Sequence, residues 1–118
     1  MTTCSAHVLD TAQDRPAAGV EVVLTDSAGA SHPACSDGSG RIGFDDVELA
    51  AGRHELRFLT GPWFVAQDRE CFHPEVVVTF TAQPGDDHLH LGLHLDAASY
   101  TTFRGETPVG AGTTGAGA

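Results

Sequence analysis

Histidines are the residues of this 118-residue chain best suited to chemistry, and three of its seven lie in one short segment, Asp86–Leu95. The segment alternates leucine with other residues. In a strand its leucines would point to one side, and His88, His90, Gly92 and His94 to the other. We expect the leucine side in the core. Because imidazoles titrate near neutral pH, the histidine side is a candidate lining for a polar cavity or a subunit interface.

Metal binding and plain solvation are the alternatives for this histidine side. Two histidines spaced by one residue on a strand can both reach one zinc ion, with a third ligand from elsewhere. Such a pair is far less specific than a spaced Cys/His framework. We therefore assign no metal, and the residues alone leave open both a metal and a histidine surface that simply faces solvent.

Three further residues are candidates because of where they stand. His7 interrupts an otherwise apolar first strand, Arg41 follows the glycine-rich turn Ser36–Gly40, and Arg104 lies in Tyr100–Glu106. Taken alone, these positions indicate a hydrogen-bonded structural histidine, an exposed charge and a plain edge strand. The remaining histidines are expected at the surface or in turns: His32, His54 and His73.

Short strands are the elements that must position these residues. Alternating apolar residues predict strands at 20–25 and 54–59, each with one apolar face. The segment 75–80 is β-branched and aromatic, which is typical of a strand covered on both faces. Turn residues separate these runs, so we expect a mainly β chain folded as an antiparallel sandwich or barrel.

Only one stretch favours a helix. Pro62–Glu70 begins with a proline, which suits a first helical turn, and is about two turns long. The glycine-rich segment 107–118 has no apolar periodicity and is expected to be a disordered C-terminal tail. The sequence thus predicts one domain over residues 1–106.

Charge and composition exclude several classes of function. The net charge is −10 and all six basic residues are arginines, without a cluster, so nucleic acid is excluded as a partner. The apolar runs are too short to span a membrane, and the N-terminus resembles no secretory signal. The three cysteines are widely spaced and odd in number, which favours reduced thiols in a cytoplasmic protein. Neither nucleic acid nor a membrane is therefore expected as a partner.

Five motifs in this sequence occur in the order known from one protein family. They are HVLDTAQDRPAAGVEVVL, SDGSGRI, FHPEVVVTF, HLHLGLHL and YTTFRGE. With them the chain resembles a divergent member of the transthyretin-like 5-hydroxyisourate hydrolase family, colinear from about His7 to Glu106. The resemblance implies a transthyretin (prealbumin)-like sandwich of two antiparallel sheets with one short helix. It also implies a homotetramer built as a dimer of dimers, with active sites in a channel at the dimer–dimer interface.

The resemblance further implies the reaction and its residues. The family opens the purine-derived ring of 5-hydroxyisourate by hydrolysis, a step in urate degradation, without a metal or organic cofactor. Matched by position, His7 and His90 become the acid–base pair, and Arg41 becomes the anchor for the substrate carbonyl or oxyanion. Arg104 would position the substrate or the C-terminal strand. The predicted substrate-binding residues are His88, Phe103, Arg104 and Gly105.

Departures from the family pattern concentrate at this site. The family's terminal Y-R-G-S motif is Phe103-Arg104-Gly105-Glu106 here, and the chain continues for twelve residues beyond it. In the histidine strand a family proline is replaced by Gly92 and a leucine by His94. A carboxylate at Glu106, close to His90, would itself serve as an acid or base, so we include Glu106 among the predicted catalytic residues.

These departures leave three functions open. The first is hydrolysis of 5-hydroxyisourate. The second is an enzyme of secondary metabolism that uses the same channel for condensation or iminium (Pictet–Spengler-like) cyclisation of an aromatic amine, because an added carboxylate attracts a cation. The third is a small-molecule carrier like transthyretin. The presence of His7, Arg41 and His90 together speaks against a carrier, which needs no such trio.

Overall fold

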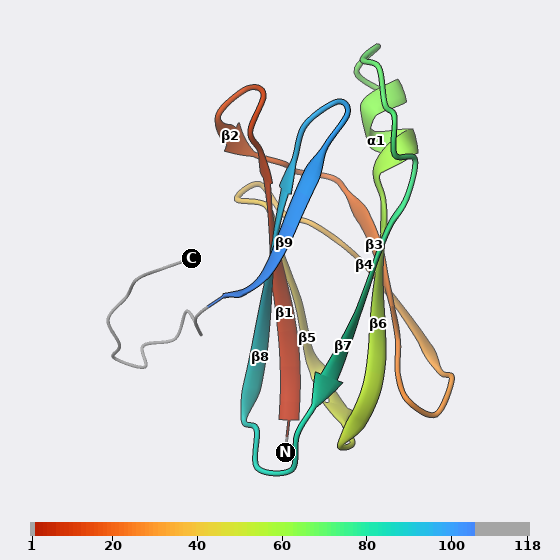
Figure 1. The fold of residues 1–118 in the computed structure, drawn as a ribbon, viewed down its shortest axis with the longest axis vertical. Coiled ribbons are helices and arrows are strands. Elements are labelled where there is room, and N and C mark those ends of the chain that lie inside the picture. The colour runs from red at the N-terminus through yellow and green to blue at the C-terminus, as the bar shows by residue number, and fades with distance from the viewer. Residues whose placement is uncertain (1, 106–118) are drawn as a thin grey trace.

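Two β-sheets face each other in the structure, with a short helix at one end of the second sheet (Figure 1). This is a computed structural model, and it describes residues 2–105. Its elements are β1 (Thr2–Asp10), β2 (Arg15–Pro16), β3 (Glu21–Thr25), β4 (Ser31–Cys35), β5 (Arg41–Leu49), β6 (Gly52–Leu59), α1 (Thr60–Val65), β7 (Val76–Ala82), β8 (His88–Leu95) and β9 (Tyr100–Gly105). The predicted disordered tail, 107–118, lies outside the described residues. No helix between residues 2 and 105 is long and apolar enough to cross a membrane.

The strand order confirms the predicted sandwich. One sheet runs β2-β1-β8-β9, with β5 also paired to β1, and the other runs β4-β3-β6-β7. All pairs are antiparallel except β1 and β8, which lie parallel from Thr3↔His88 to Asp10↔Leu95. The two histidine-bearing strands are therefore direct neighbours, although some eighty residues separate them in sequence.

Period-two alternation decides which side chains fill the core. In β1 the even-numbered residues Cys4, Ala6 and Val8 are fully buried, and the odd-numbered ones are half-buried on the outer side. All four leucines of β8 are buried, as predicted. Burial raises the pKa of the Cys4 thiol to about 12, so this cysteine is an inert core residue.

Strand β7 departs from its prediction. It was expected to be covered on both faces, and this was wrong for the single chain: Val77 is 42% exposed, and Thr79 and Thr81 are also exposed. The physical reason is that the sandwich has two layers, so only one face of each strand meets the opposite sheet. That inner face carries Val76 and Phe80.

His54 is the clearest correction among the histidines, because it was expected at the surface and is 2% exposed. It lies in β6 on the same side as the core residues Leu56 and Phe58. Its Nε2–H donates to the carbonyl of Ala50 (2.8 Å), and its Nδ1 accepts the N–H of Ser27 (3.0 Å). A histidine with both nitrogens bonded is a tolerable core residue.

The helix is shorter than predicted. α1 covers six residues, Thr60–Val65, rather than Pro62–Glu70, and is followed by a turn. It begins early because the N–H of Gly61 bonds to the carbonyl of Pro74 (2.7 Å). It cannot continue through Asp68, whose φ of 56° lies in the left-handed region.

Candidate active site

The outer face of the first sheet brings the three central candidates together. On β1, His7 pairs with Arg41 of β5 on one side and with Gly92 of β8 on the other. Two residues earlier, Ser5 pairs with His90. Paired residues of neighbouring strands lie on the same side of a sheet, so His7, Arg41 and His90 share one face.

The turn at residues 36–40 fixes His7 and Arg41 relative to each other. The Asp37 carboxylate accepts the backbone N–H groups of Arg41 (3.0 Å) and Ser39 (2.9 Å), and these bonds hold its pKa below the usual range. Gly40 closes the turn with a φ of 80°, which glycine adopts without strain. The Nε2–H of His7 then donates to the carbonyl of Ser39 (2.9 Å).

These contacts leave the functional ends of both side chains open. A carbonyl oxygen can only accept, so Nε2 of His7 carries the proton of the neutral ring, and Nδ1 is the nitrogen with a free lone pair. Among the side chains of residues 2–105, the exposed Arg41 guanidinium has no ion pair or hydrogen bond. Its five N–H donors are therefore available for an anionic or carbonyl oxygen.

His90 is the most enclosed of the candidates, with 3% of its surface exposed. Its Nδ1 bonds to Oγ of Ser5 (2.7 Å), and the same Oγ bonds to Nε2 of His88 (2.8 Å). Nδ1 of His88 in turn bonds to Oγ1 of Thr3 (2.7 Å). The two rings are thus joined through one serine hydroxyl.

Burial is the main reason that the pKa of His90 is lowered from 6.5 to about 4. The positive charge of Arg41 and the neighbouring imidazoles of His7 and His88 lower it further. His90 is consequently a neutral ring at pH 7, able to accept a proton or, in the appropriate tautomer, to donate one.

Strand β9 brings the C-terminal motif beside these residues. Phe103 pairs with Gly92 and Gly105 with His90, so both stand on the outer face. Arg104 pairs with Leu91, which places it on the opposite side, where its guanidinium lies 3.9 Å from the Asp86 carboxylate. The predicted catalytic residue Glu106 lies outside the described residues.

Phe103 occupies space that a larger residue at position 92 would take. A Cβ at Gly92 would overlap the Phe103 ring, so the absence of a side chain there lets the ring lie against β8. The ring also meets His94 edge-on, with centroids 5.1 Å apart. The outer face thus carries an apolar floor next to the His7–Arg41 pair.

The part of the chain that the structure describes contains no cluster of metal-binding side chains. No group of three or more His, Cys, Asp or Glu side chains between residues 2 and 105 is arranged to hold an ion. His88 and His90 direct nitrogens to Ser5 instead.

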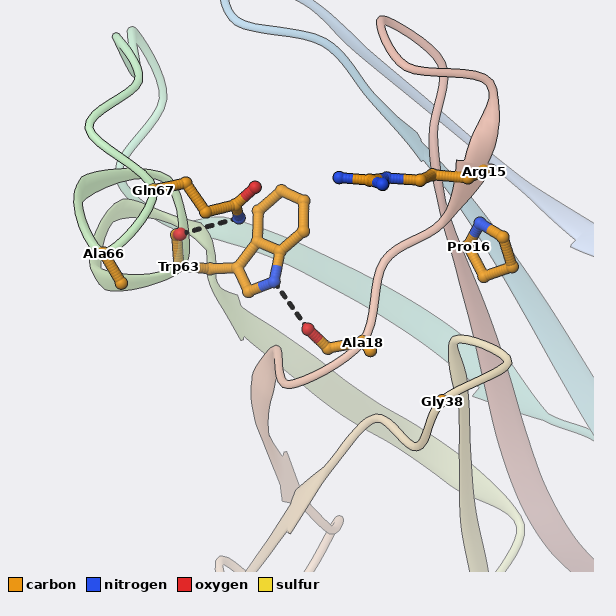
Figure 2. Close-up of a pocket in the computed structure, with 7 residues that line it drawn as sticks. All are labelled: Arg15, Pro16, Ala18, Gly38, Trp63, Ala66 and Gln67. Atoms are coloured by element: carbon orange, nitrogen blue, oxygen red, sulfur yellow. Dashed lines mark hydrogen bonds between the residues drawn. The ribbon is translucent and has the colours of Figure 1, made fainter.

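Two cavities are lined by described residues. The larger, of about 520 Å³, lies between the β2 segment, the 36–40 turn and α1, where the Arg15 side chain extends toward the Trp63 indole (Figure 2). Trp63 is fixed there by its Nε1–H bond to the Ala18 carbonyl (2.7 Å). Arg15 is the only ionisable residue in this lining, so the cavity offers no acid–base pair. A smaller cavity, of about 210 Å³, opens between β7 and the β8–β9 pair, and its lining includes His90, Phe103 and Arg104.

Sequence reasoning missed the hydroxyl groups of this site. Ser5 and Thr3 precede His7 by two and four residues, so in a strand they must share its face. That periodicity was a usable signal. Their bonding to His88 and His90 depends on the parallel β1–β8 register, which no local pattern reveals.

A family model decides the relationship of this chain to known proteins. The model of the HIUase/Transthyretin family matches residues 4–105. The chain belongs to this family. The match covers the strands that contribute to the outer face, apart from Thr2 and Thr3 at the start of β1.

Individual members of the family agree with this assignment. The 5-hydroxyisourate hydrolase of Salmonella dublin is 33% identical over 107 residues, which cover 86% of this chain and 79% of the relative. A solved Klebsiella pneumoniae 5-hydroxyisourate hydrolase is 33% identical, with a TM-score of 0.82 over 90% of this chain and all of that one. Sea bream transthyretin, solved in complex with thyroxine, is 26% identical, with a TM-score of 0.77 over 90% of this chain and 97% of that one.

Proposed function

We propose that this chain is a 5-hydroxyisourate hydrolase of purine metabolism, which adds water across a cyclic amide bond. The observation that carries the proposal is the meeting of His7, Arg41 and His90 on one outer sheet face. Family membership and the hydrolase relatives support the reaction. These relatives do not favour the repurposed cyclase, and a carrier has no use for an acid–base pair beside an arginine.

His7 is the proposed general base. Its Nδ1 lone pair is free of described partners, and the Ser39 carbonyl holds the ring in the tautomer that exposes this nitrogen. Nδ1 would take a proton from water as the water oxygen bonds to the amide carbonyl carbon. The C–N bond then breaks, and the departing nitrogen receives a proton.

Arg41 is the proposed oxyanion anchor. When water adds, negative charge develops on the carbonyl oxygen, and the guanidinium of Arg41, whose backbone the 36–40 turn fixes, would stabilise that charge more than the neutral substrate. His90, neutral at pH 7, is the proposed partner that returns a proton to the leaving nitrogen.

The other predicted residues keep supporting roles in the proposal. Phe103 and Gly105 would form the floor and edge of the substrate site, and His88 would adjoin it. The ion pair of Arg104 with Asp86 supports a role in positioning β9. Glu106 remains a proposed acid or base at the end of the motif.

Assembly and location complete the proposal. We infer a homotetramer, a dimer of dimers in which two chains close each site, in keeping with the family. The three cysteines, all free, are consistent with a cytoplasmic setting. No cofactor or metal is proposed.

The test is an ultraviolet assay with freshly generated 5-hydroxyisourate. We expect decay well above the spontaneous rate, and a fall of roughly 10²–10³-fold in kcat for Arg41→Lys, which keeps the charge but not the fork of donors. Arg15→Lys, in the separate cavity of Figure 2, is the matched control and should retain full activity. Decay at the spontaneous rate with the wild-type protein would rule out the hydrolase.

A further inference from the structure

Four side chains form a continuous hydrogen-bonded row between the parallel strands β1 and β8. In order they are Thr3, His88, Ser5 and His90, joined by contacts of 2.7, 2.8 and 2.7 Å. The row alternates hydroxyl and imidazole groups, each able both to donate and to accept. It exists because the parallel register sets Thr3 opposite His88 and Ser5 opposite His90.

We propose that Thr3, His88 and Ser5 are a proton relay that loads and unloads His90. The inference rests on the proposed function only for the reaction that uses the transferred protons, because the hydrogen-bonded row itself is a property of the folded chain. In it, His88 and Ser5 act on the reaction through His90 rather than by touching substrate.

The hydrogen bonds of the row can point in either of two directions, and the row holds the same number of protons in each. In one, Nδ1–H of His90 donates to Ser5, the Ser5 hydroxyl donates to Nε2 of His88, and Nδ1–H of His88 donates to Thr3. Nε2 of His90 then has a free lone pair and is a base. When this nitrogen takes a proton from the outer face, each proton in the row moves one place, and the Thr3 hydroxyl releases one to solvent.

The second direction is the product of that shift. Thr3 now donates to Nδ1 of His88, Nε2–H of His88 donates to Ser5, and Ser5 donates to Nδ1 of His90. Nε2–H of His90 is then an acid, ready to protonate a leaving nitrogen. One proton has entered and one has left, and no ring has become a cation.

The surroundings of His90 explain why such a path is needed. Its ring is nearly enclosed, with Arg41 on β5, His7 on β1 and His88 on its own strand as the charged or titratable groups that disfavour an imidazolium. On β9 the opposite residue is Gly105, and Arg104 faces the other side. A ring that resists becoming a cation can still transfer protons if one leaves Nδ1 as another arrives at Nε2.

The open end of His90 is consistent with this path. Its Nε2 makes no hydrogen bond to any residue between 2 and 105. No side-chain polar atom in that range is both fully buried and unbonded, so Nε2 of His90 retains some solvent-accessible surface. The other end of the row, Thr3, is half-buried near the start of both strands.

The first test needs no substrate. The relay requires His88 and His90 to share a tautomer, both Nδ1–H or both Nε2–H, because the Ser5 hydroxyl can donate to only one ring while accepting from the other. Nitrogen-15 NMR of the two rings at pH 7 measures this directly. Opposite tautomers would break the row at Ser5 and overturn the relay, whether or not the protein hydrolyses 5-hydroxyisourate.

The second test separates a relay from a structural role. In His88→Gln the amide can still hydrogen-bond to Ser5 but cannot pass a proton on, and Ser5→Ala removes the link itself. We expect kcat to fall about 10- to 100-fold in both variants with KM little changed, and added imidazole to restore part of the His88→Gln rate. Thr11→Val is the control, because Thr11 also bonds from the end of β1 to β8, at the Leu95 carbonyl (2.8 Å), outside the row.

The outcomes are distinct. Folded His88→Gln with the kcat of Thr11→Val, or a loss that imidazole does not restore, would overturn the relay while leaving the hydrolase intact. If the wild-type protein has no hydrolase activity, the proposed function is wrong. The NMR measurement of the tautomers of His88 and His90 would then be the one test of the relay.

Discussion

His90 combines deep burial with a position at the centre of the proposed chemistry. An ordinary histidine on a strand face would be half-protonated near pH 6.5, whereas the pKa of His90 is about 4. The lowered value keeps the ring neutral through the physiological range, which suits proton transfer between tautomers. It also couples the ionisation of this one residue to the stability of the whole chain.

That coupling gives a prediction for stability against pH. In the unfolded chain His90 takes up a proton below about pH 6.5, but in the folded chain only below about pH 4, so the unfolded state binds more protons in between. Folding stability should therefore fall as the pH drops from about 6.5 to 4, by roughly 3 kcal/mol from this residue alone. Urea unfolding of wild type and of His90→Gln across this range measures the difference. Parallel curves for the two proteins would contradict the assignment.

At the residue scale, the motifs singled out His7, Arg41 and His90, and the structure brings these three to one sheet face. The alternation of His88–Leu95 also indicated that His88, His90 and His94 share one face. It could not indicate that Ser5 joins two imidazoles, because that contact follows from pairing between distant strands. The local sequence pattern predicts which face of the sheet a side chain occupies, and the strand register determines which side chains are its neighbours.

Strands β8 and β9 are coupled through the contact between Gly92 and Phe103. The two residues are register partners, and a side chain at 92 would meet the aromatic ring. Because the ring takes the space that a Cβ at position 92 would need, the missing Cβ and the ring form a matched pair. This pair shapes the apolar floor of the proposed site.

Gly92→Ala should therefore destabilise the chain by about 1–2 kcal/mol, because the Phe103 ring must leave its place. In a Phe103→Ala background the same change should be neutral or slightly favourable, since alanine is the better strand residue. Urea unfolding of the two single variants and the double variant gives the coupling energy. Equal effects in both backgrounds would show that the strands are not coupled here.

At the element scale, single-sequence patterns placed the strands well and their environment less well. The β-branched and aromatic composition of segment 75–80 favoured a strand covered on both faces, yet β7 has one exposed face. His54 looked like a surface residue because histidine is polar, yet alternation with Leu56 sets it in the core. Composition suggested burial for both faces of β7 and solvent for His54, and both suggestions were wrong because the side of the sheet decides burial.

At the scale of the whole molecule, charge opposes the assembly that the family suggests. Each chain carries a formal charge of −10, so four chains carry −40 before histidines are counted. Repulsion of this kind weakens association at low ionic strength, and salt screens it over about 10 Å at 0.1 M. The exposed edge strands β7 and β9 each pair with one strand only within residues 2–105, which leaves edges that a second copy can extend.

We therefore expect a tetramer of four 12.3 kDa chains, about 49 kDa, whose dissociation constant falls as salt is raised. If two chains close each site, specific activity should decline when the protein is diluted below that constant, and the decline should shift to lower protein concentration at 0.5 M NaCl than at 0.05 M. Light scattering after gel filtration measures the mass, and the ultraviolet assay over a dilution series measures the activity. A 12.3 kDa species with undiminished kcat would show that the outer face of one chain is a complete site. Loss of activity on dilution while the tetramer mass is retained would instead show that the loss does not come from dissociation of the assembly.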